Sequence, residues 1–240
     1  DTHCHIDQYS DPMHLANESD RLNINTIGMT NLPSHFEIGY KHLLSHKKVR
    51  LALGMHPLYA NLHKNELPIF LRNLKKTSYI GEIGLDFSKE GNATRQIQLS
   101  SFNRILKELK GKKKIISLHS RRAEKEVLEL LIENKIQNAI FHWYSGPVKL
   151  IDEIVRNGYY FSINPAMIYS KSGQDAIQKI PLENLLTESD GPFIQVENRQ
   201  IRPSDISLVI NYLSSKNNLT PKFIEEKIYQ NFKKLIDNIS

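Results

Sequence analysis

Cysteine is almost absent from this chain of 240 residues, and Cys4 is its only example. A single cysteine excludes an internal disulfide and agrees with a reducing compartment. No stretch approaches the ~18 consecutive apolar residues of a membrane span, and the first residues are polar and rich in histidine instead of forming a signal-peptide core. We therefore expect a cytoplasmic protein without membrane segments.

Linkers, internal repeats and low-complexity tracts are also absent from the sequence. Hydrophobic residues make up 40% of the chain and charged residues 24%, which is typical of a folded protein with a large core. We expect residues 1–240 to form a single domain.

What the sequence does contain is a rhythm of eight short apolar runs. They recur about every 25 to 30 residues, at 2–6, 24–29, 49–53, 79–83, 115–119, 139–142, 159–163 and 185–188, with helical patterns or polar loops between them. Such alternation is typical of a parallel sheet, and eight βα units predict a TIM-type barrel.

Helical spacing of apolar residues predicts helices around 99–109, 127–131 and 206–213. Gly111 stands where a helix-ending glycine belongs, and a last helix begins with Thr220 as N-cap and Pro221 at its first position. Polar residues dominate 8–23, so we expect a short or irregular first helix there.

Reactive groups of a TIM barrel collect at the carboxyl ends of its strands. Six histidines and carboxylates stand at such ends, namely His3, His5, Glu82, His119, His142 and Asp190. Glu82 lies in the apolar segment 81–86, where an unpaired buried charge would cost several kcal/mol. Imidazoles and carboxylates that converge from separate strands predict a metal site.

This set exceeds the needs of one tetrahedral zinc and suits two divalent ions that share a carboxylate and a hydroxide. Glu82 is the natural bridging ligand, and Asp190 can ligate one ion and act as general base for the attacking hydroxide. The choice among Mg, Mn and Zn stays open. Asp86 and Glu188 are candidates to hydrogen-bond the ligands from behind, or to serve a structural role.

Candidate substrate contacts follow the same strand ends. His56, in the segment 54–57, and Arg121 are placed to hold phosphate, although Arg121 also fits a surface role. Trp143 and Tyr144 either stack on bases or cap the barrel. The net charge of +6 favours polyanionic partners, whereas the lysine-rich run 110–114 suits a solvated turn at the far end of the barrel.

At these residues the sequence resembles the TatD-like family of metal-dependent deoxyribonucleases, which belongs to the amidohydrolase-like barrels. The resemblance covers nearly the whole chain and rests on segments 1–7, 54–57, 81–86, 98–102, 119–121, 142–146, 188–192 and 231–232. It implies a metal-dependent hydrolase that cleaves DNA phosphodiester bonds, typically from a 3′ end or on single strands. It also implies that the six strand-end residues are metal ligands, with Glu82 in the place of the carbamylated lysine of related amidohydrolases.

The chain departs from the family pattern in two places. Two aromatics stand where the family has one between the strand-six histidine and Ser-Gly, and the segment after strand eight is reduced to 201–203. The runs 141–146 and 159–165 resemble the TatD-like subgroup of Qat anti-phage defence systems, which implies protein partners of a defence complex. Two alternatives remain open, namely an amidohydrolase-like enzyme acting on a small amide or phosphoester and a weakly active subunit of such a complex.

Overall fold

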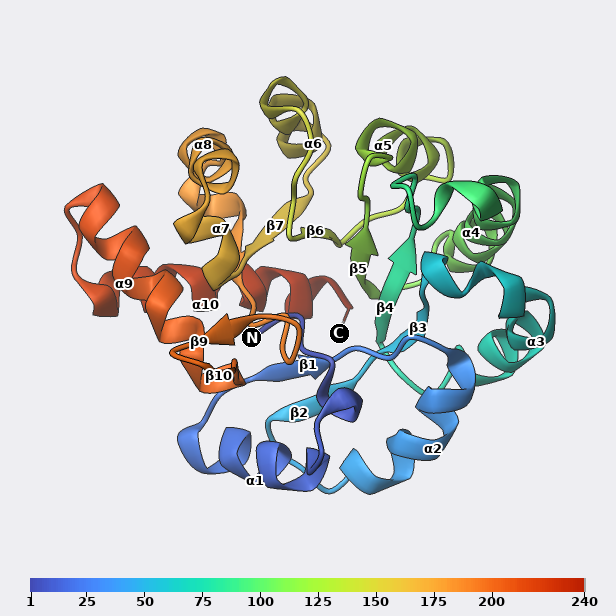
Figure 1. Cartoon of the computed structure of the whole chain (residues 1–240), viewed down its shortest axis with the longest axis horizontal. Coiled ribbons are helices and arrows are strands. Elements are labelled where there is room, and N and C mark those ends of the chain that lie inside the picture. Colours follow the sequence, from blue (N-terminus) through green and yellow to red (C-terminus); the bar gives the residue numbers. More distant parts are fainter. Residues whose placement is uncertain (240) are drawn as a thin grey trace.

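A ring of short parallel strands surrounded by helices organises the computed structural model, which describes residues 1–239 (Figure 1). Six strands form one sheet in the order β3-β4-β5-β6-β7-β8, while β1 pairs with β2 and β9 pairs with β10. The strand bounds are β1 (Thr26–Gly28), β2 (Val49–Leu51), β3 (Leu53–Met55), β4 (Tyr79–Gly84), β5 (Ile115–His119), β6 (Ala139–His142), β7 (Tyr160–Ile163), β8 (Leu185–Thr187), β9 (Gln195–Val196) and β10 (Arg199–Gln200).

Helices follow the strands along the chain and form the outer layer of the ring (Figure 1). Their bounds are α1 (Pro12–Leu22), α2 (Pro33–Leu43), α3 (His63–Asn73), α4 (Arg95–Leu109), α5 (Glu124–Glu133), α6 (Ile151–Arg156), α7 (Pro165–Tyr169), α8 (Lys171–Lys179), α9 (Ile206–Asn217) and α10 (Pro221–Ile239). The predicted helices around 99–109, 127–131 and 206–213 are confirmed as α4, α5 and α9.

Backbone hydrogen bonds between the first and last strand positions close the ring. Cys4 forms a parallel bridge with Gly28. On its other side, the Thr2 amide donates to the carbonyl of Thr187, the last residue of β8, over 2.8 Å. The sheet therefore has no free edge at this seam, and the predicted TIM-type barrel is confirmed.

Two of the eight predicted strands differ in detail. The run 2–6 contributes only the bridge at Cys4, because a 3₁₀ turn already begins at Ile6. The run 49–53 is divided at Ala52 into β2 and β3, of which β2 pairs with β1 and β3 with β4. Both runs occupy their predicted positions in the barrel, although their strand pairings are shorter than expected.

The expectation of an irregular first helix is wrong, because α1 is a regular helix of 11 residues. Asp11 caps it by accepting a hydrogen bond from the His14 amide, and Pro12 occupies its first turn. Asn23 ends it in the left-handed conformation, which asparagine tolerates well. Capping at both ends therefore supports a helix whose composition is mostly polar.

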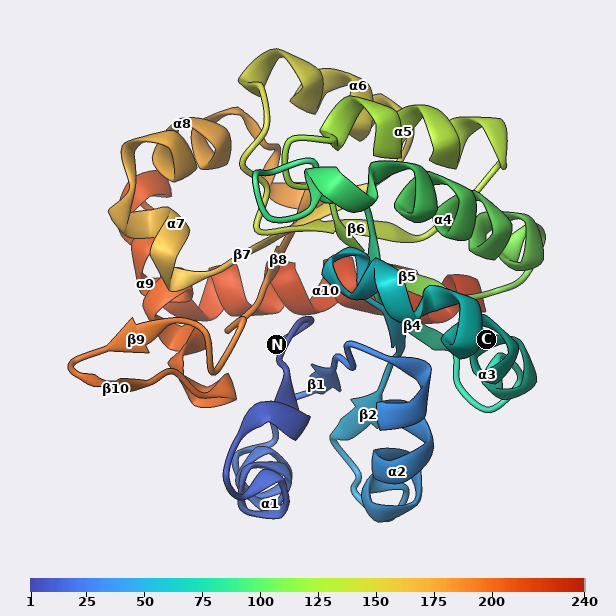
Figure 2. The same cartoon turned by 45° about the vertical axis from the view of Figure 1, so that its right-hand side comes forward.

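The last helix, α10, runs across the amino-terminal ends of the strands (Figure 2). Thr220 Oγ1 accepts from the Phe223 amide, which confirms the predicted N-cap. Leu235 packs in a cluster with Ile115, Ile140 and Leu186, which lie in β5, β6 and β8 respectively. Helix α10 thus covers this end of the barrel and leaves the carboxyl ends of the strands for the site.

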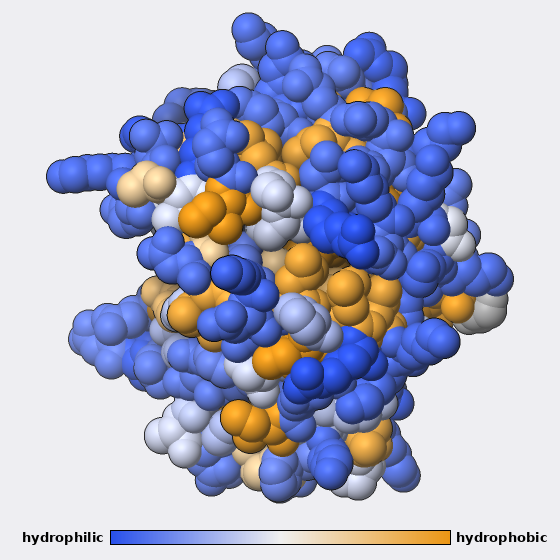
Figure 3. Space-filling view, turned by 90° about the vertical axis from the view of Figure 1, so that its right-hand side faces the viewer, coloured by the Kyte–Doolittle hydropathy of each residue, from blue (hydrophilic) through white to orange (hydrophobic). Residues whose placement is uncertain are grey.

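The surface seen from the side of the barrel is mainly hydrophilic, with one larger hydrophobic area near the middle of the view and smaller ones around it (Figure 3). Among residues 1–239, no helix is both long enough and apolar enough to cross a membrane.

Candidate metal centre

Glu82 lies at the centre of the candidate site, buried in β4. Gly84 allows β4 to approach β5 here, since its φ is +144° and an added Cβ would lie 2.0 Å from the His119 carbonyl oxygen. This close approach brings the side chains of Glu82 and His119 to the same end of the barrel.

Among residues 1–239, five histidines direct a ring nitrogen at the Glu82 carboxylate. On the Oε1 side lie His119 Nδ1 at 2.5 Å and His142 Nε2 at 3.0 Å; on the Oε2 side lie the Nε2 atoms of His5 at 3.2 Å, His56 at 3.4 Å and His3 at 3.6 Å. The two oxygens of one carboxylate therefore face two separate groups of imidazoles.

The outward ring nitrogen of His3 and of His142 is held by a polar neighbour. His3 Nδ1 lies 2.8 Å from Ser117 Oγ, and His142 Nδ1 lies 3.4 Å from Glu188 Oε1. A partner on one nitrogen fixes the ring and directs the other nitrogen inward. Both Nε2 atoms consequently point toward Glu82.

His119 and His56 are oriented in the same way. His119 Nε2 lies 2.8 Å from Asp86 Oδ2, which leaves Nδ1 for Glu82. His56 Nδ1 accepts a hydrogen bond from the Leu58 amide over 3.2 Å, which leaves its Nε2 for Glu82. The predicted phosphate contact His56 therefore lies closer to the carboxylate cluster than its loop position suggested.

Glu188 is fully buried and hydrogen-bonded. Besides His142, its oxygens accept from the Trp143 amide at 3.1 Å, from Asn164 Nδ2 at 2.9 Å and from the Ser162 hydroxyl. With these donors around it, Glu188 is suited to support His142 and is turned away from the open cavity.

Asp190 follows β8 and lies close to His3 and His5. Its amide donates to the His3 carbonyl over 2.9 Å, and its Oδ1 lies 3.6 Å from His3 Nε2 and 3.8 Å from His5 Nε2. Its φ of +49° lies in the left-handed region, where Asp is tolerated better than branched residues. Asp190 adopts this backbone conformation where its carboxylate lies beside His3 and His5.

Burial and mutual charges shift the ionisation of these groups in different directions. Burial opposes the charge of Glu82, but the neighbouring His56, His142 and His119 outweigh it and hold the pKa of Glu82 well below its usual range. Burial, with the charges of nearby carboxylates, raises the pKa of Asp190 to about 7. Glu82 therefore keeps its negative charge among the imidazoles far more readily than Asp190 does.

The pKa values of the histidines also shift in opposite directions. Burial, followed by the charge of His142, lowers the pKa of His3 to about 3. For His142 and His119 burial also acts to lower the pKa, but the nearby carboxylates, Glu82 first, outweigh it and raise the pKa of both.

The donor atoms match the requirements of divalent transition ions. Three sets, each with all its ligand atoms within 4.8 Å of one another, are His3-Glu82-His142, His3-His5-Asp190 and His56-Glu82-His119. Imidazole nitrogens with carboxylate oxygens suit Zn or Mn, and the carboxylates also suit Mg. The residues present thus fit the metal dependence that the sequence predicted, with Glu82 common to two of the sets.

A cavity of about 620 Å³ opens from this cluster to the surface. It is lined by His5, Asn31, His56, Leu58, Tyr59, Glu82, Asp86, His119, Ser120, Arg121, His142, Trp143, Ser145, Asp190 and Phe193. Arg121 lies at its edge, exposed and 4.0 Å from Glu90. The structure therefore brings Arg121, His56 and Trp143 together around one cavity, and their contact with a substrate stays a prediction.

The prediction that Tyr144 contacts the substrate is wrong in this structure. Tyr144 is only 1% exposed, its ring packs edge to face against Phe161, and its hydroxyl donates to the Pro147 carbonyl. Trp143, by contrast, is 36% exposed at the cavity. Its φ of +37° turns the chain between the two residues, so the second aromatic enters the core.

Two aromatic residues of the cavity were not found in the sequence. Phe193 is 60% exposed and its ring lies 4.9 Å from that of His5, while Tyr59 stands 6.0 Å from His56. Each follows a candidate residue by three positions, Asp190 and His56 respectively, and this proximity was the available signal. Both stand in non-strand segments, where periodicity gives no direction for a side chain.

The chain is similar to known proteins over most of its length. A family model described as TatD related DNase matches residues 1–237. The chain is 28% identical to an uncharacterised metal-dependent hydrolase of Methanocaldococcus jannaschii, over 76% of this chain and 74% of that protein. It is 27% identical to the deoxyribonuclease TATDN3 of Homo sapiens, over 78% and 74% of the two chains.

Solved structures show the same fold. The crystal structure of a TatD homologue from Escherichia coli K12, YJJV, superposes with a TM-score of 0.87 at 23% identity, covering 98% of this chain and 96% of that one. A TatD-family hydrolase from Entamoeba histolytica gives a TM-score of 0.80 at 19% identity, with the same coverage.

Proposed function

The chain belongs to the TatD related DNase family of metal-dependent hydrolases, and we propose that it cleaves phosphodiester bonds in single-stranded DNA or at 3′ ends. The observation that carries the proposal is the Glu82 carboxylate, whose two oxygens face two groups of inward-directed imidazoles. A shared carboxylate between two ligand groups is the arrangement used by two-ion phosphoesterases.

We propose that Glu82 is common to two divalent ions. His3 and His5 lie on its Oε2 side with Asp190 close to both of them, and His119 and His142 lie on its Oε1 side. Divalent ions bound there would supply Lewis-acid polarisation of the phosphate and activation of water. Asp86 and Glu188 orient two of these histidines through their outward nitrogens.

Within this arrangement Asp190 is proposed to accept the proton of the attacking water. It stands at the cavity wall, and its Oδ1 lies close to the imidazoles of His3 and His5. A carboxylate beside the ligands and open to the cavity can serve as general base, whereas the enclosed Glu188 cannot reach the substrate.

The cavity walls support a DNA strand as the substrate. Arg121 and His56 line the cavity, where they would contact phosphate, and Trp143, Phe193 and Tyr59 offer exposed rings for bases. Unpaired bases can stack on such rings directly, whereas the terminal bases of a closed duplex must first be unstacked, which costs free energy. We therefore propose a preference for single-stranded or frayed DNA.

A panel of substrates tests this function. Single-stranded, duplex and frayed DNA would be compared with small chromogenic phosphoesters and amides, each with added Mg, Mn or Zn. Cleavage of single strands above all others supports the proposal. Efficient turnover of only a small amide or phosphoester would replace it with the amidohydrolase-like alternative, and inactivity on the whole panel would favour a non-catalytic subunit.

We further propose that residues 1–240 act as one hydrolase domain. The family match across residues 1–237 supports this proposal. A cytoplasmic location and protein partners of a Qat-type defence system stay predictions of the sequence.

A further inference from the structure

The positive charge of the chain is concentrated in four loops. Residues 44–48, 74–78, 110–114 and 134–138 contain nine lysines and neither Asp nor Glu. The other 220 residues carry 23 Lys and Arg against 26 Asp and Glu, so outside these loops the chain is slightly acidic. The net charge of +6 therefore originates in only 20 residues.

These four loops lie at one end of the barrel. They directly precede β2, β4, β5 and β6; β4, β5 and β6 are parallel neighbours in one sheet, and β2 is parallel to β1 and is followed by β3, which pairs with β4. The loops before parallel strands share the amino-terminal end of a barrel, whereas the candidate metal centre is at the carboxyl end. The basic surface is consequently on the face opposite the catalytic cavity.

Most of these lysines are also unpaired. Within the described part of the chain, eight of them form no ion pair, namely Lys47, Lys48, Lys75, Lys76, Lys110, Lys112, Lys114 and Lys135, whereas cations on helix sides such as Arg104, Lys125 and Lys171 have a carboxylate four residues away. Clustered unpaired cations repel one another and raise the local positive potential. The positive potential of this face therefore favours the binding of a polyanion.

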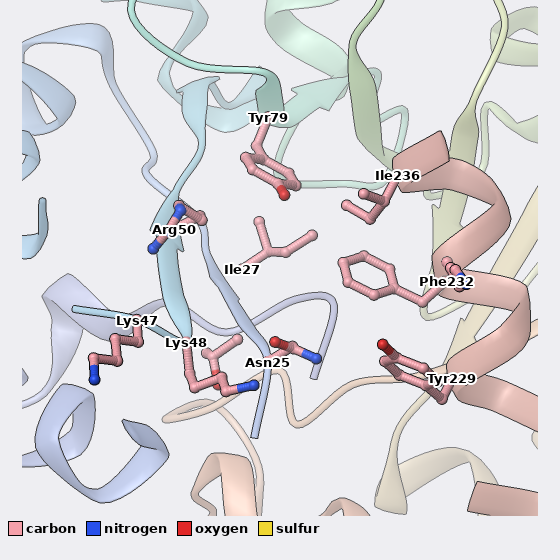
Figure 4. A pocket seen from close by; sticks show the side chains of 11 residues that line it. Asn25, Ile27, Lys47, Lys48, Arg50, Tyr79, Tyr229, Phe232 and Ile236 are labelled. Atoms are coloured by element: carbon pink, nitrogen blue, oxygen red, sulfur yellow. The ribbon is translucent and has the colours of Figure 1, made fainter. Parts of the chain in front are cut away.

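A hollow of about 240 Å³ lies in the same face, between α10 and the strands β1 and β2. Figure 4 shows Tyr79, Ile236, Phe232 and Tyr229 around Ile27, which forms the apolar floor. Lysines line it from both sides, Lys47 and Lys48 before β2 and Lys233 on α10.

Each component of the hollow suits one part of a nucleotide. The ring of Tyr229 is 51% exposed, so a base can stack on it, and Asn25 beside it offers polar atoms. Lysine ammonium groups at the margin suit the phosphates. The hollow is smaller than the ~300–1,000 Å³ pockets that enclose whole small molecules, while the lysines extend far beyond it along the face.

We propose that this face is a second binding surface for single-stranded nucleic acid, separate from the catalytic cavity. One base occupies the hollow against Tyr229, and the flanking phosphates follow the lysines of the four loops. An anionic membrane would instead favour protruding apolar residues, whereas the aromatic rings here form a concavity. The surface holds a strand by charge and stacking and takes no part in cleavage.

Binding of labelled dT20 by the full chain in excess EDTA tests this surface, with fluorescence anisotropy at several salt concentrations. The test variant combines Lys47→Ala, Lys48→Ala and Lys233→Ala. The matched control combines Arg104→Ala, Lys125→Ala and Lys171→Ala, which removes three cations already paired with carboxylates on helix sides.

We expect the test variant to bind dT20 about tenfold or more weakly at 0.1 M salt and its log–log salt slope to be shallower by about 2, because three phosphate contacts are lost. The control should bind within about twofold of the wild type. Tyr229→Ala should weaken binding by roughly 5- to 100-fold, as loss of one base stack does. Melting temperatures of all variants are measured as well, and unchanged values verify that these surface substitutions leave the fold intact.

Equal dT20 affinities for the test variant and the control would overturn the proposal. So would loss of binding to phosphatidylserine vesicles with unchanged dT20 binding, because it would identify a lipid surface. The EDTA assay involves no cleavage, so it decides this surface even if the chain proves inactive as a nuclease. Conversely, an active chain with no dT20 binding at this face would retain the proposed function and lose only the second surface.

Discussion

Asp190 shows how much depends on the placement of one carboxylate. It stands within 3.6 Å of His3 Nε2 and lines the cavity, whereas Glu188, two residues earlier, is enclosed by hydrogen-bond donors. Two neighbouring acids thus have different environments and are assigned different roles.

The change Asp190→Asn should lower the rate of DNA cleavage by on the order of 10² to 10⁴, because the amide cannot accept the proton of water. DNA affinity should change little, since the amide keeps the shape of the side chain. Single-turnover kinetics with a binding titration separate the two effects. A variant with near-normal rate would show that the base lies elsewhere.

Trp143 is a second single residue whose role can be tested, because we assign its exposed ring to base stacking. Trp143→Ala should weaken binding of single-stranded DNA by about 1 to 3 kcal/mol, the usual value of one base–aromatic stack. Binding by the metal-loaded Asp190→Asn background avoids cleavage during the titration.

The neighbouring Tyr144 supplies the control, because it is buried and does not line the cavity. Tyr144→Phe removes only the hydrogen bond to Pro147, so it should lower the melting temperature slightly and leave DNA affinity unchanged. The stacking role of Trp143 is refuted if Trp143→Ala lowers the melting temperature but binds DNA normally.

At the scale of elements, the strands explain why most of the site was predictable. A strand ending in His or Glu inside a βα unit directs that group to the barrel mouth, whatever the details of pairing. His119 and His142 were found in this way, and the short pairing of the first run did not displace His3 or His5. Only the order of the strands and their ends was needed to predict this cluster of candidate metal ligands.

Loops and caps were harder to predict for a physical reason. The side of the chain that Tyr144 takes depends on the φ of Trp143, and no period of two applies outside a strand. Helix α1 was misjudged because its caps at Asp11 and Asn23 compensate for a polar composition. Phe193 and Tyr59 were missed for the same reason as Tyr144.

A further prediction concerns the contact between α2 and α3. Glu37 accepts two hydrogen bonds from Arg72, at 2.9 and 2.6 Å, and one from Asn73 at 2.7 Å. The Arg72 guanidinium, followed by the Asn73 amide, lowers the pKa of Glu37 to about 2. Because the folded pKa is below the unfolded value of about 4.3, this contact stabilises the fold above pH ~4.3.

That stabilisation should be lost as the pH falls from about 4.3 toward 2, since protonation then favours the unfolded chain. Glu37→Gln removes the charge, so the difference in melting temperature between wild type and variant should shrink over this window. The contribution is small, because the pair is partly exposed and screened by water. A difference that stays constant from pH 6 to pH 2.5 would contradict the assignment.

At the scale of the whole molecule, the barrel separates two chemistries at its two ends. The carboxyl ends of the strands carry imidazoles and buried carboxylates, and the amino-terminal ends carry lysines around α10. The lysine-rich run 110–114 was expected to be a solvated turn, and by itself it is no more than that. It contributes to the proposed binding surface only because folding brings three other lysine-containing loops to the same face.

The most direct test of the account is cleavage of a labelled single-stranded oligonucleotide after removal of metal. Wild-type protein treated with chelator should be inactive and should regain activity with Mn or Mg, while metal analysis reports the bound ions. Glu82→Ala should lose both the metal and nearly all activity, because two adjacent cations lose their shared neutralising ligand. Glu133→Ala, which removes an exposed carboxylate on α5, serves as the matched control and should behave as wild type. Cleavage that survives chelation, or that is unchanged in Glu82→Ala, would contradict the account.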